Sequence, residues 1–128
     1  MSLSGRCHCG AVSFSVADSA VGVINCHCRD CQQLHGNFNA MAGVPREALN
    51  IEGETLVWYE SSDKARRGSC GACGSRLFKD NLGSERMMVS MGAFDASTGL
   101  RNFKNIWVES KGAWYDLPTE EPANFQRG

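Results

Sequence analysis

The segment SCGACG, residues 69–74, contains a CxxC pair followed by glycine, and a shortened form, CHCG, occupies residues 7–10. Such pairs form zinc knuckles, in which glycine lets the chain turn with positive φ so that backbone amides point at the sulfurs. Two knuckles together supply four thiolates, the usual ligand set of a structural zinc site. We therefore predict a zinc site at Cys7, Cys9, Cys70 and Cys73 that closes a long loop and organises the fold.

The other three cysteines, Cys26, Cys28 and Cys31, lie within NCHCRDC, residues 25–31. Three protein ligands leave one position of a tetrahedral metal open, which is the arrangement of catalytic zinc. Three thiolates on Zn²⁺ carry a net charge of about −1, so the metal is a weak Lewis acid toward water and suits a soft fourth ligand. A thiol bound there would be deprotonated at neutral pH, which indicates chemistry that makes or breaks a carbon–sulfur bond.

Spacing alone leaves other assignments open. His35, four residues after Cys31, can complete a closed site on a short helix. Alternatively, the CxxC pair completes the central cluster, and Cys7 and Cys9 are left over. A redox dithiol is disfavoured, because such pairs open a helix after a strand, whereas this CxxC lies between expected strands.

Composition limits the classes of function. The chain has 128 residues, 42% of them hydrophobic, which predicts one domain over residues 1–128. The formal net charge of −1 offers little attraction for nucleic acid or an anionic membrane, and no apolar run is long enough to cross a bilayer. No signal-peptide pattern is present, so we expect a cytoplasmic protein. In that compartment seven clustered cysteines favour metal ligands or catalytic thiols over disulfides or buried apolar thiols.

Short apolar stretches separated by turn residues predict an all-β domain. Residues 11–16 alternate apolar and polar side chains, and residues 21–25 are expected to form the neighbouring strand. Further strands are expected at 38–44, 49–52, 55–60, 76–79, 87–91 and 103–109. Helical turns are expected at 29–35, 45–49 and 119–125.

Four segments, in this order, resemble one known family: GRCHCGAVSFSV (5–16), NCHCRDCQQLHGNF (25–38), GSCGACGSRLF (68–78) and NIWVESKGAWYDL (105–117). They are similar to the glutathione-dependent formaldehyde-activating enzyme family, which also contains centromere-protein-V-type domains. The resemblance covers residues 5–117 and leaves 118–128 as a C-terminal tail. Where the family often has an aromatic residue before the CxxC and a histidine at the start of the last segment, this chain has Ser69 and Asn105.

The resemblance implies a β-tent fold of stacked antiparallel sheets and two zinc ions per chain. The structural zinc would lie on Cys7, Cys9, Cys70 and Cys73, and the catalytic zinc on Cys26, Cys28 and Cys31. The second site is open to partial occupancy, because an exposed three-thiolate site holds metal less tightly and oxidises more easily. The implied activity is a carbon–sulfur lyase reaction that reversibly joins formaldehyde and glutathione as S-(hydroxymethyl)glutathione.

Glutathione carries two carboxylates, so a binding groove for it would offer cations. Arg29 beside the central cluster, and Arg66 and Arg67 before the knuckle, are the candidates for substrate contact, although solvated surface charge is the commoner role of arginine. His27 lies between two proposed ligands. Three roles are open for its side chain: to point away from the metal, to donate a hydrogen bond to a ligand, or to transfer a proton. The tryptophans, Trp58, Trp107 and Trp114, are expected in the core.

Two functions from different classes remain. The enzyme interpretation has as partners a small-molecule thiol, glutathione or a related compound, and a small electrophile, formaldehyde or another, with no nucleic acid or membrane. The alternative is a non-catalytic scaffold, held together by zinc, that binds a protein or a nucleic acid.

Overall fold

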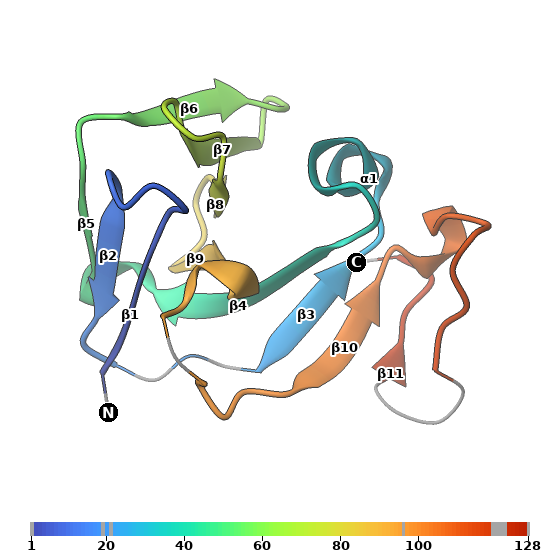
Figure 1. The fold of residues 1–128 in the computed structure, drawn as a ribbon. Coiled ribbons are helices and arrows are strands. Elements are labelled where there is room, and N and C mark those ends of the chain that lie inside the picture. The colour runs from blue at the N-terminus through green and yellow to red at the C-terminus, as the bar shows by residue number, and fades with distance from the viewer. Residues whose placement is uncertain (1, 19, 21, 96, 119–122, 128) are drawn as a thin grey trace.

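The computed structural model describes residues 2–18, 20, 22–95, 97–118 and 123–127. Over these residues the chain forms eleven strands in two sheets, one α-helix and three short 3₁₀ helices. The all-β class expected from the sequence, and the two-sheet β-tent architecture implied by the resemblance, are therefore confirmed. Figure 1 shows the smaller sheet standing beside the curved larger one.

The smaller sheet has the strand order β1-β2-β5 and is antiparallel throughout. Its strands are β1 (Leu3–Arg6), β2 (Ser13–Val16) and β5 (Leu49–Glu52). In β2 the side chains of Phe14 and Val16 are buried and that of Ser15 is exposed. This alternation is the pattern of a strand with one face on the core.

The larger sheet has the strand order β11-β10-β3-β4-β9-β8-β7-β6. Its strands, in chain order, are β3 (Val23–Cys26), β4 (Asn39–Pro45), β6 (Leu56–Glu60), β7 (Ala65–Cys70), β8 (Arg76–Asn81), β9 (Arg86–Ser90), β10 (Asn102–Ile106) and β11 (Ala123–Asn124). The resemblance implies antiparallel sheets, but β10 runs parallel to both β3 and β11. Figure 1 shows why: after β9 the chain runs along the bottom of the molecule and enters β10 from the same end as β3.

The helix α1 (Arg29–His35) has the bounds expected from the sequence. It begins at Cys28, whose sulfur accepts a hydrogen bond from the Cys31 amide, and ends at Gly36, where φ is 92° and glycine is favoured. The 3₁₀ helices are η1 (Arg46–Ala48), within the turn expected at 45–49, η2 (Met91–Ala93) and η3 (Val108–Ser110). No helix in the described part of the chain has the length and apolar content needed to span a membrane.

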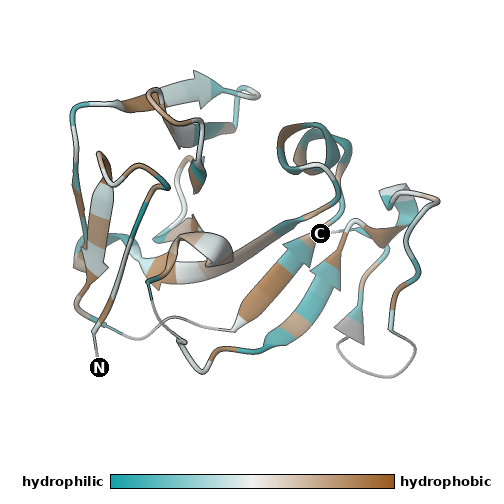
Figure 2. Ribbon diagram, viewed as in Figure 1, coloured by the Kyte–Doolittle hydropathy of each residue, from teal (hydrophilic) through white to brown (hydrophobic). Residues whose placement is uncertain are grey.

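The two faces of the larger sheet pack against different parts of the molecule. Paired residues such as Phe78 and Val89 face the smaller sheet and form the main core with Phe14, whose ring meets that of Phe78 edge-on at 5.6 Å. The next residues along these strands, Lys79 and Met88, are also paired and point to the opposite face. On that second face a smaller apolar cluster surrounds the central cysteines. Figure 2 shows the mainly hydrophobic β3 beside the hydrophilic β10.

One sequence-based expectation about the sheets was wrong, and two strands were missed. The second strand, expected at 21–25, is not the neighbour of β2, because β2 is already paired on both sides, with β1 and β5. It instead pairs with β4 and β10 in the larger sheet. The strands β1 and β7 were not expected, because their sequences, LSGR and ARRGSC, are short of apolar residues.

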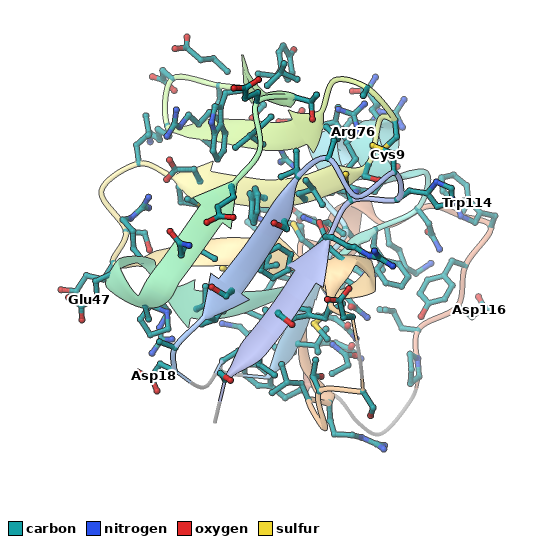
Figure 3. All side chains as sticks on the ribbon, turned by 60° about the vertical axis from the view of Figure 1, so that its left-hand side comes forward. Cys9, Asp18, Glu47, Arg76, Trp114 and Asp116 are labelled. Carbon is teal, nitrogen blue, oxygen red and sulfur yellow. The ribbon has the colours of Figure 1, made fainter. Side chains whose placement is uncertain are left out.

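The C-terminal part of the chain also departs from expectation. The strand expected at 103–109 ends at Ile106, because Trp107 adopts a left-handed conformation with φ of 56° and starts η3. Of the helical turn expected at 119–125, residues 119–122 lie outside the described residues, and Ala123–Asn124 is a strand. Trp114 is 65% exposed and is not a core residue, and Figure 3 shows it at the periphery.

Candidate metal centres

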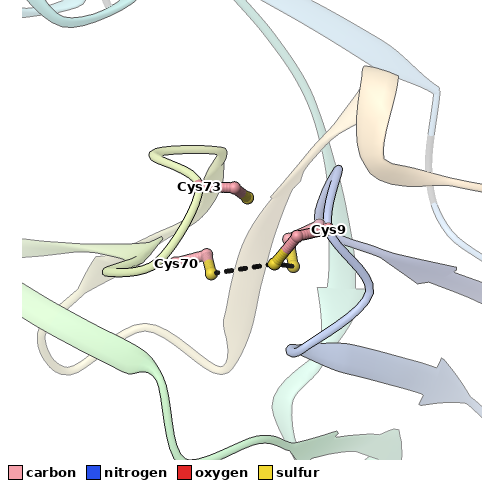
Figure 4. Close-up of side chains that lie close together, drawn as sticks. Cys9, Cys70 and Cys73 are labelled. Carbon is pink, nitrogen blue, oxygen red and sulfur yellow. Dashed lines mark hydrogen bonds between the residues drawn. The ribbon is translucent and has the colours of Figure 1, made fainter.

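The first cysteine cluster joins the two sheets. Cys7 and Cys9 lie in the loop between β1 and β2, Cys70 ends β7, and Cys73 lies in the turn before β8. The four sulfurs lie within 4.8 Å of one another, with Cys7 Sγ 3.6 Å from Cys9 Sγ, which is 3.8 Å from Cys70 Sγ (Figure 4). A tetrahedron with metal–sulfur bonds of about 2.3 Å has sulfur–sulfur edges of about 3.8 Å. The spacing therefore fits a tetrahedral ion.

Backbone and hydroxyl groups around this first cluster contact its sulfurs. The Val12 amide donates to Cys7 Sγ at 3.2 Å, and Thr55 Oγ1 lies 3.3 Å from Cys70 Sγ. The contact with Thr55 lowers the pKa of Cys70, and the hydrogen bonds from Ser75 lower the pKa of Cys73 to about 5. Hydrogen bonds of this kind stabilise thiolates, the form in which cysteine binds a metal.

The second cluster is formed by Cys26, at the end of β3, and by Cys28 and Cys31, at the start of α1. Their three sulfurs also lie within 4.8 Å of one another. Cys26 and Cys31 are buried and Cys28 is half-buried. Because all three ligand atoms are sulfurs, the cluster fits a thiophilic ion such as Zn²⁺.

No further His, Cys, Asp or Glu of the described residues adds a ligand atom to this second group. His35, which the sequence left as a candidate fourth ligand, is not part of it. The structure also differs from the alternative partition, in which the CxxC pair completes the central cluster. Cys70 and Cys73 lie with Cys7 and Cys9 instead. The two clusters thus offer four and three sulfurs.

Within the second cluster the thiols interact strongly. Contacts with the Cys26 and Cys31 side chains lower the pKa of Cys28, and the nearby Lys79 acts in the same direction. Contacts with the Cys28 and Cys31 side chains, together with burial, raise the pKa of Cys26. A metal bound to all three sulfurs would release their remaining protons.

Of the three candidate arginines, only Arg67 contacts this cluster. Its Nη1 and Nη2 atoms lie 3.6 and 3.8 Å from Cys31 Sγ. The neighbouring Arg66 points to the other face of the sheet, where its Nε donates to Asp80 Oδ2 at 2.9 Å. Arg29 is exposed on α1 and donates to Gln32 Oε1 at 3.2 Å. The period of two along a strand explains why successive arginines have different environments.

Two histidines lie close to the second cluster. The ring of His27 is fully buried against Phe38 and Tyr115, at centroid distances of 5.0 and 5.7 Å, and neither ring nitrogen has a hydrogen-bond partner among the described residues. Burial lowers the pKa of His27. Burial, with the positive charge of Arg67 nearby, lowers the pKa of His35 to about 4. Both imidazoles are therefore neutral at pH 7.

Sequence reasoning missed several residues at this site. Met41, Met88 and Trp107 pack against the three cysteines, and Ser61 contacts Arg67. The strand period predicts that Met88 and Arg67 share a face only once β7, β8 and β9 are known to be adjacent. For Ser61 and for the left-handed Trp107 the sequence contains no signal that we can identify.

Comparison with known proteins agrees with this geometry. A crystal structure of a Rhodobacter sphaeroides protein superposes with a TM-score of 0.61 and 22% identity, over 73% of this chain and 89% of that one, which shows a shared fold. A family model described as glutathione-dependent formaldehyde-activating enzyme matches residues 2–110. Since the match spans both cysteine clusters and most of the chain, the protein belongs to the glutathione-dependent formaldehyde-activating enzyme family, as the resemblance predicted.

Proposed function

We propose that the protein is a zinc-dependent enzyme of the carbon–sulfur lyase type, which joins glutathione or a related thiol to formaldehyde or another small electrophile. The observation that supports this proposal is the difference between the clusters. One has four sulfurs, as a closed structural site requires, and the other has three, with no fourth side-chain ligand among the described residues.

The proposal assigns two zinc ions per chain. Cys7, Cys9, Cys70 and Cys73 would hold the structural ion, and Cys26, Cys28 and Cys31 the catalytic one, which can be partly occupied. Zinc held by the three cysteines would bind the sulfur of a thiol and lower its pKa, so that the sulfur acts as a thiolate nucleophile at neutral pH. Glutathione is abundant in the reducing cytoplasm, where we expect the protein to act.

The charges near the second cluster support an anionic substrate. Lys79 lowers the pKa of Cys28, and both Arg67 and Arg76 lower that of His35, so the surroundings of the cysteines are electropositive. Arg29 is exposed on α1, one residue after Cys28, and its guanidinium, which donates one hydrogen bond to Gln32, has further N–H groups for a carboxylate of the thiol. Arg66 donates to Asp80 on the other face of the sheet, so we assign it no substrate contact.

The first experiment pairs the same substitution in the two clusters. Cys28→Ser removes one sulfur of the second cluster, and serine retains the ability to cap α1. We expect this variant to stay folded, to lose about one zinc per chain and to lose thiol-dependent turnover. Cys9→Ser, the matched control in the first cluster, should instead lower the thermal stability strongly. Circular dichroism, metal analysis and an assay of formaldehyde consumption with glutathione measure these outcomes.

The titration of zinc-loaded protein with glutathione and with S-methylglutathione tests the open position directly. A free sulfur is needed for coordination, so glutathione should bind the more tightly of the two. Equal affinities, or a Cys28→Ser variant that simply unfolds, would favour the alternative of a zinc-stabilised scaffold that binds a protein or a nucleic acid.

A further inference from the structure

Arg67 carries a buried charge next to the second cluster. Its side chain lies in the middle of β7 and the residue is only 5% exposed. The two terminal nitrogens contact Cys31 Sγ at 3.6 and 3.8 Å, and Nε donates to Ser61 Oγ at 3.3 Å. A guanidinium does not lose its proton in a protein, so this position holds a permanent positive charge.

No carboxylate of the described residues neutralises that charge. In the described part of the chain Arg67 takes part in no ion pair with Asp or Glu, whereas the adjacent Arg66 pairs with Asp80. A buried charge without a counter-ion is strongly destabilising. Among the contacts of Arg67, the sulfur of Cys31 is the one that can carry a negative charge, and it would do so as a metal-bound thiolate.

The contact between Arg67 and Cys31 changes the net charge of the second cluster with its bound metal. A divalent ion with three thiolates carries about −1, and the guanidinium brings the total to about zero. A thiolate that adds as fourth ligand then brings the assembly to about −1. Without Arg67 the same addition would give about −2 in surroundings of low dielectric, where like charges repel strongly. The other nearby cations are more exposed, Lys79 being half-buried and Arg76 exposed, so solvent screens them more.

We propose that Arg67 is a positioning residue that makes the second cluster select an anionic, sulfur-donating fourth ligand over a neutral one. The inference rests on the proposed function, since it concerns the same open position. When a thiol binds, its S–H bond breaks, the proton passes to solvent, and a metal–sulfur bond forms without oxidation or reduction. Arg67 keeps all its protons throughout and acts through Cys31.

The test uses the full chain with cobalt(II) in place of zinc, because thiolate-to-cobalt charge-transfer bands report coordination without any turnover. The probes are 2-mercaptoethanol, which binds as an anion and has no carboxylate, and imidazole, which binds as a neutral ligand. Each is titrated into wild type and into the variants Arg67→Met and Arg67→Lys. Arg67→Met keeps the length of the side chain but removes its charge.

We expect Arg67→Met to weaken binding of 2-mercaptoethanol by roughly tenfold or more, from the loss of a hydrogen-bonded charge. Imidazole binding should change by less than about threefold, because the charge of the assembly does not alter. Arg67→Lys should restore part of the preference for thiol. If Arg67→Met does not fold, Ser61→Ala, which frees Nε of Arg67, and Arg67→Lys serve as the readout, each expected to reduce the preference by a smaller factor.

The matched control is Arg66→Met, the same substitution one residue away on the other face of the strand. It should lower stability, through loss of the contact with Asp80, but leave the ratio of thiol to imidazole affinity unchanged. Equal effects of Arg67→Met on both probes, no effect on either, or a changed ratio in Arg66→Met would overturn the inference. If 2-mercaptoethanol does not change the cobalt spectrum of the wild-type protein, the proposed function is overturned. If Arg67→Met binds the thiol as tightly as wild type, only the role of Arg67 is overturned.

Discussion

At the scale of single residues, the buried carboxylate of Asp80 balances two arginines from different parts of the chain. Arg46 Nη2 donates to one oxygen at 2.7 Å and Arg66 Nε donates to the other at 2.9 Å. Burial by itself would raise the pKa of Asp80, but the hydrogen bonds and charges of the two arginines outweigh it, and the pKa lies below its usual value. Asp80 thereby links β7 and β8 to η1.

We predict that Asp80→Asn lowers the free energy of unfolding by about 2 kcal/mol at neutral pH, because two charge-assisted hydrogen bonds become weaker and the arginines are partly exposed. The native pKa lies below the unfolded value of about 3.9, so the unfolded chain binds more protons between the two values. The contribution is therefore complete above about pH 4 and is lost as the pH falls through the native pKa.

Denaturant unfolding of wild type and Asp80→Asn across a pH series measures this difference. The gap between the two proteins should be constant from neutral pH to about pH 5 and should narrow below about pH 4. A gap that widens on acidification would contradict the assignment of an ionised Asp80 to this site.

At the scale of secondary structure, the contact between β1 and η2 depends on a residue without a side chain. Gly5 is buried, lies opposite Phe14 in the smaller sheet, and also forms an isolated bridge with Phe94. A Cβ added at Gly5 would collide with the carbonyl oxygen of Ala93 and with the ring of Phe14. The close approach of β1 to η2 therefore requires glycine.

We predict that Gly5→Ala lowers the free energy of unfolding by about 2 kcal/mol, because β1 must move away from η2 or the ring of Phe14 must move. Gly92→Ala is the matched control: it adds the same methyl group in η2, where nothing lies within 4 Å of the new Cβ. Its effect should stay within about 0.5 kcal/mol. Thermal or denaturant unfolding measures the stability of both variants. If Gly5→Ala and Gly92→Ala are equally stable, β1 can move to accommodate the added methyl group.

At the scale of the whole molecule, the first cluster lies where the two sheets meet, and a metal bound by its four cysteines would crosslink them. It brings the β1–β2 loop to the end of β7, whereas the second cluster joins only β3 to the start of α1. A crosslink between distant parts of the chain restricts the unfolded state more than one between neighbours. A metal held by the first cluster would therefore contribute far more to folding stability than one held by the second.

We predict that a chelator removes metal in two steps. The first equivalent of metal should come from the three-sulfur cluster, and its removal should change the melting temperature little. The second should come from the four-sulfur cluster, and its removal should abolish the cooperative unfolding transition. Metal analysis alongside calorimetry at each step checks the order. Simultaneous loss of both equivalents, or collapse of the fold with the first, would contradict the division into one stabilising and one exchangeable site.

Several features of this protein follow from local sequence. The bounds of α1 follow from its caps, Cys28 and Gly36, and the strands at 49–52 and 55–60 follow from their turns. The grouping of the seven cysteines into four and three was the favoured reading of their spacing, since knuckle residues must lie close together in the chain. The helix and strand bounds and the two knuckles depend on interactions over a few residues, whereas the meeting of Cys7 and Cys9 with Cys70 and Cys73 is a long-range contact.

The polar strands β1 and β7 could not be predicted from the sequence, because their conformation depends on pairing with other strands. β7 has the sequence ARRGSC, which lacks the apolar alternation of a half-buried strand, and its conformation is imposed by pairing with β6 and β8. The same holds for β10, whose parallel pairing with β3 depends on the path of the chain between them. Local propensity gives no information on such pairings.

The amino-acid sequence thus determined which side chains can bind metal and that the fold is built of strands, because ligand chemistry and strand period are local properties. The tertiary structure decided what surrounds the ligands. It turned Arg67 toward Cys31 and Arg66 toward Asp80, and it left the three-cysteine cluster without a fourth protein ligand among the described residues. The physical reason is that the face to which a strand residue points is fixed by pairing with distant strands, and a shift of one residue would exchange the two arginines.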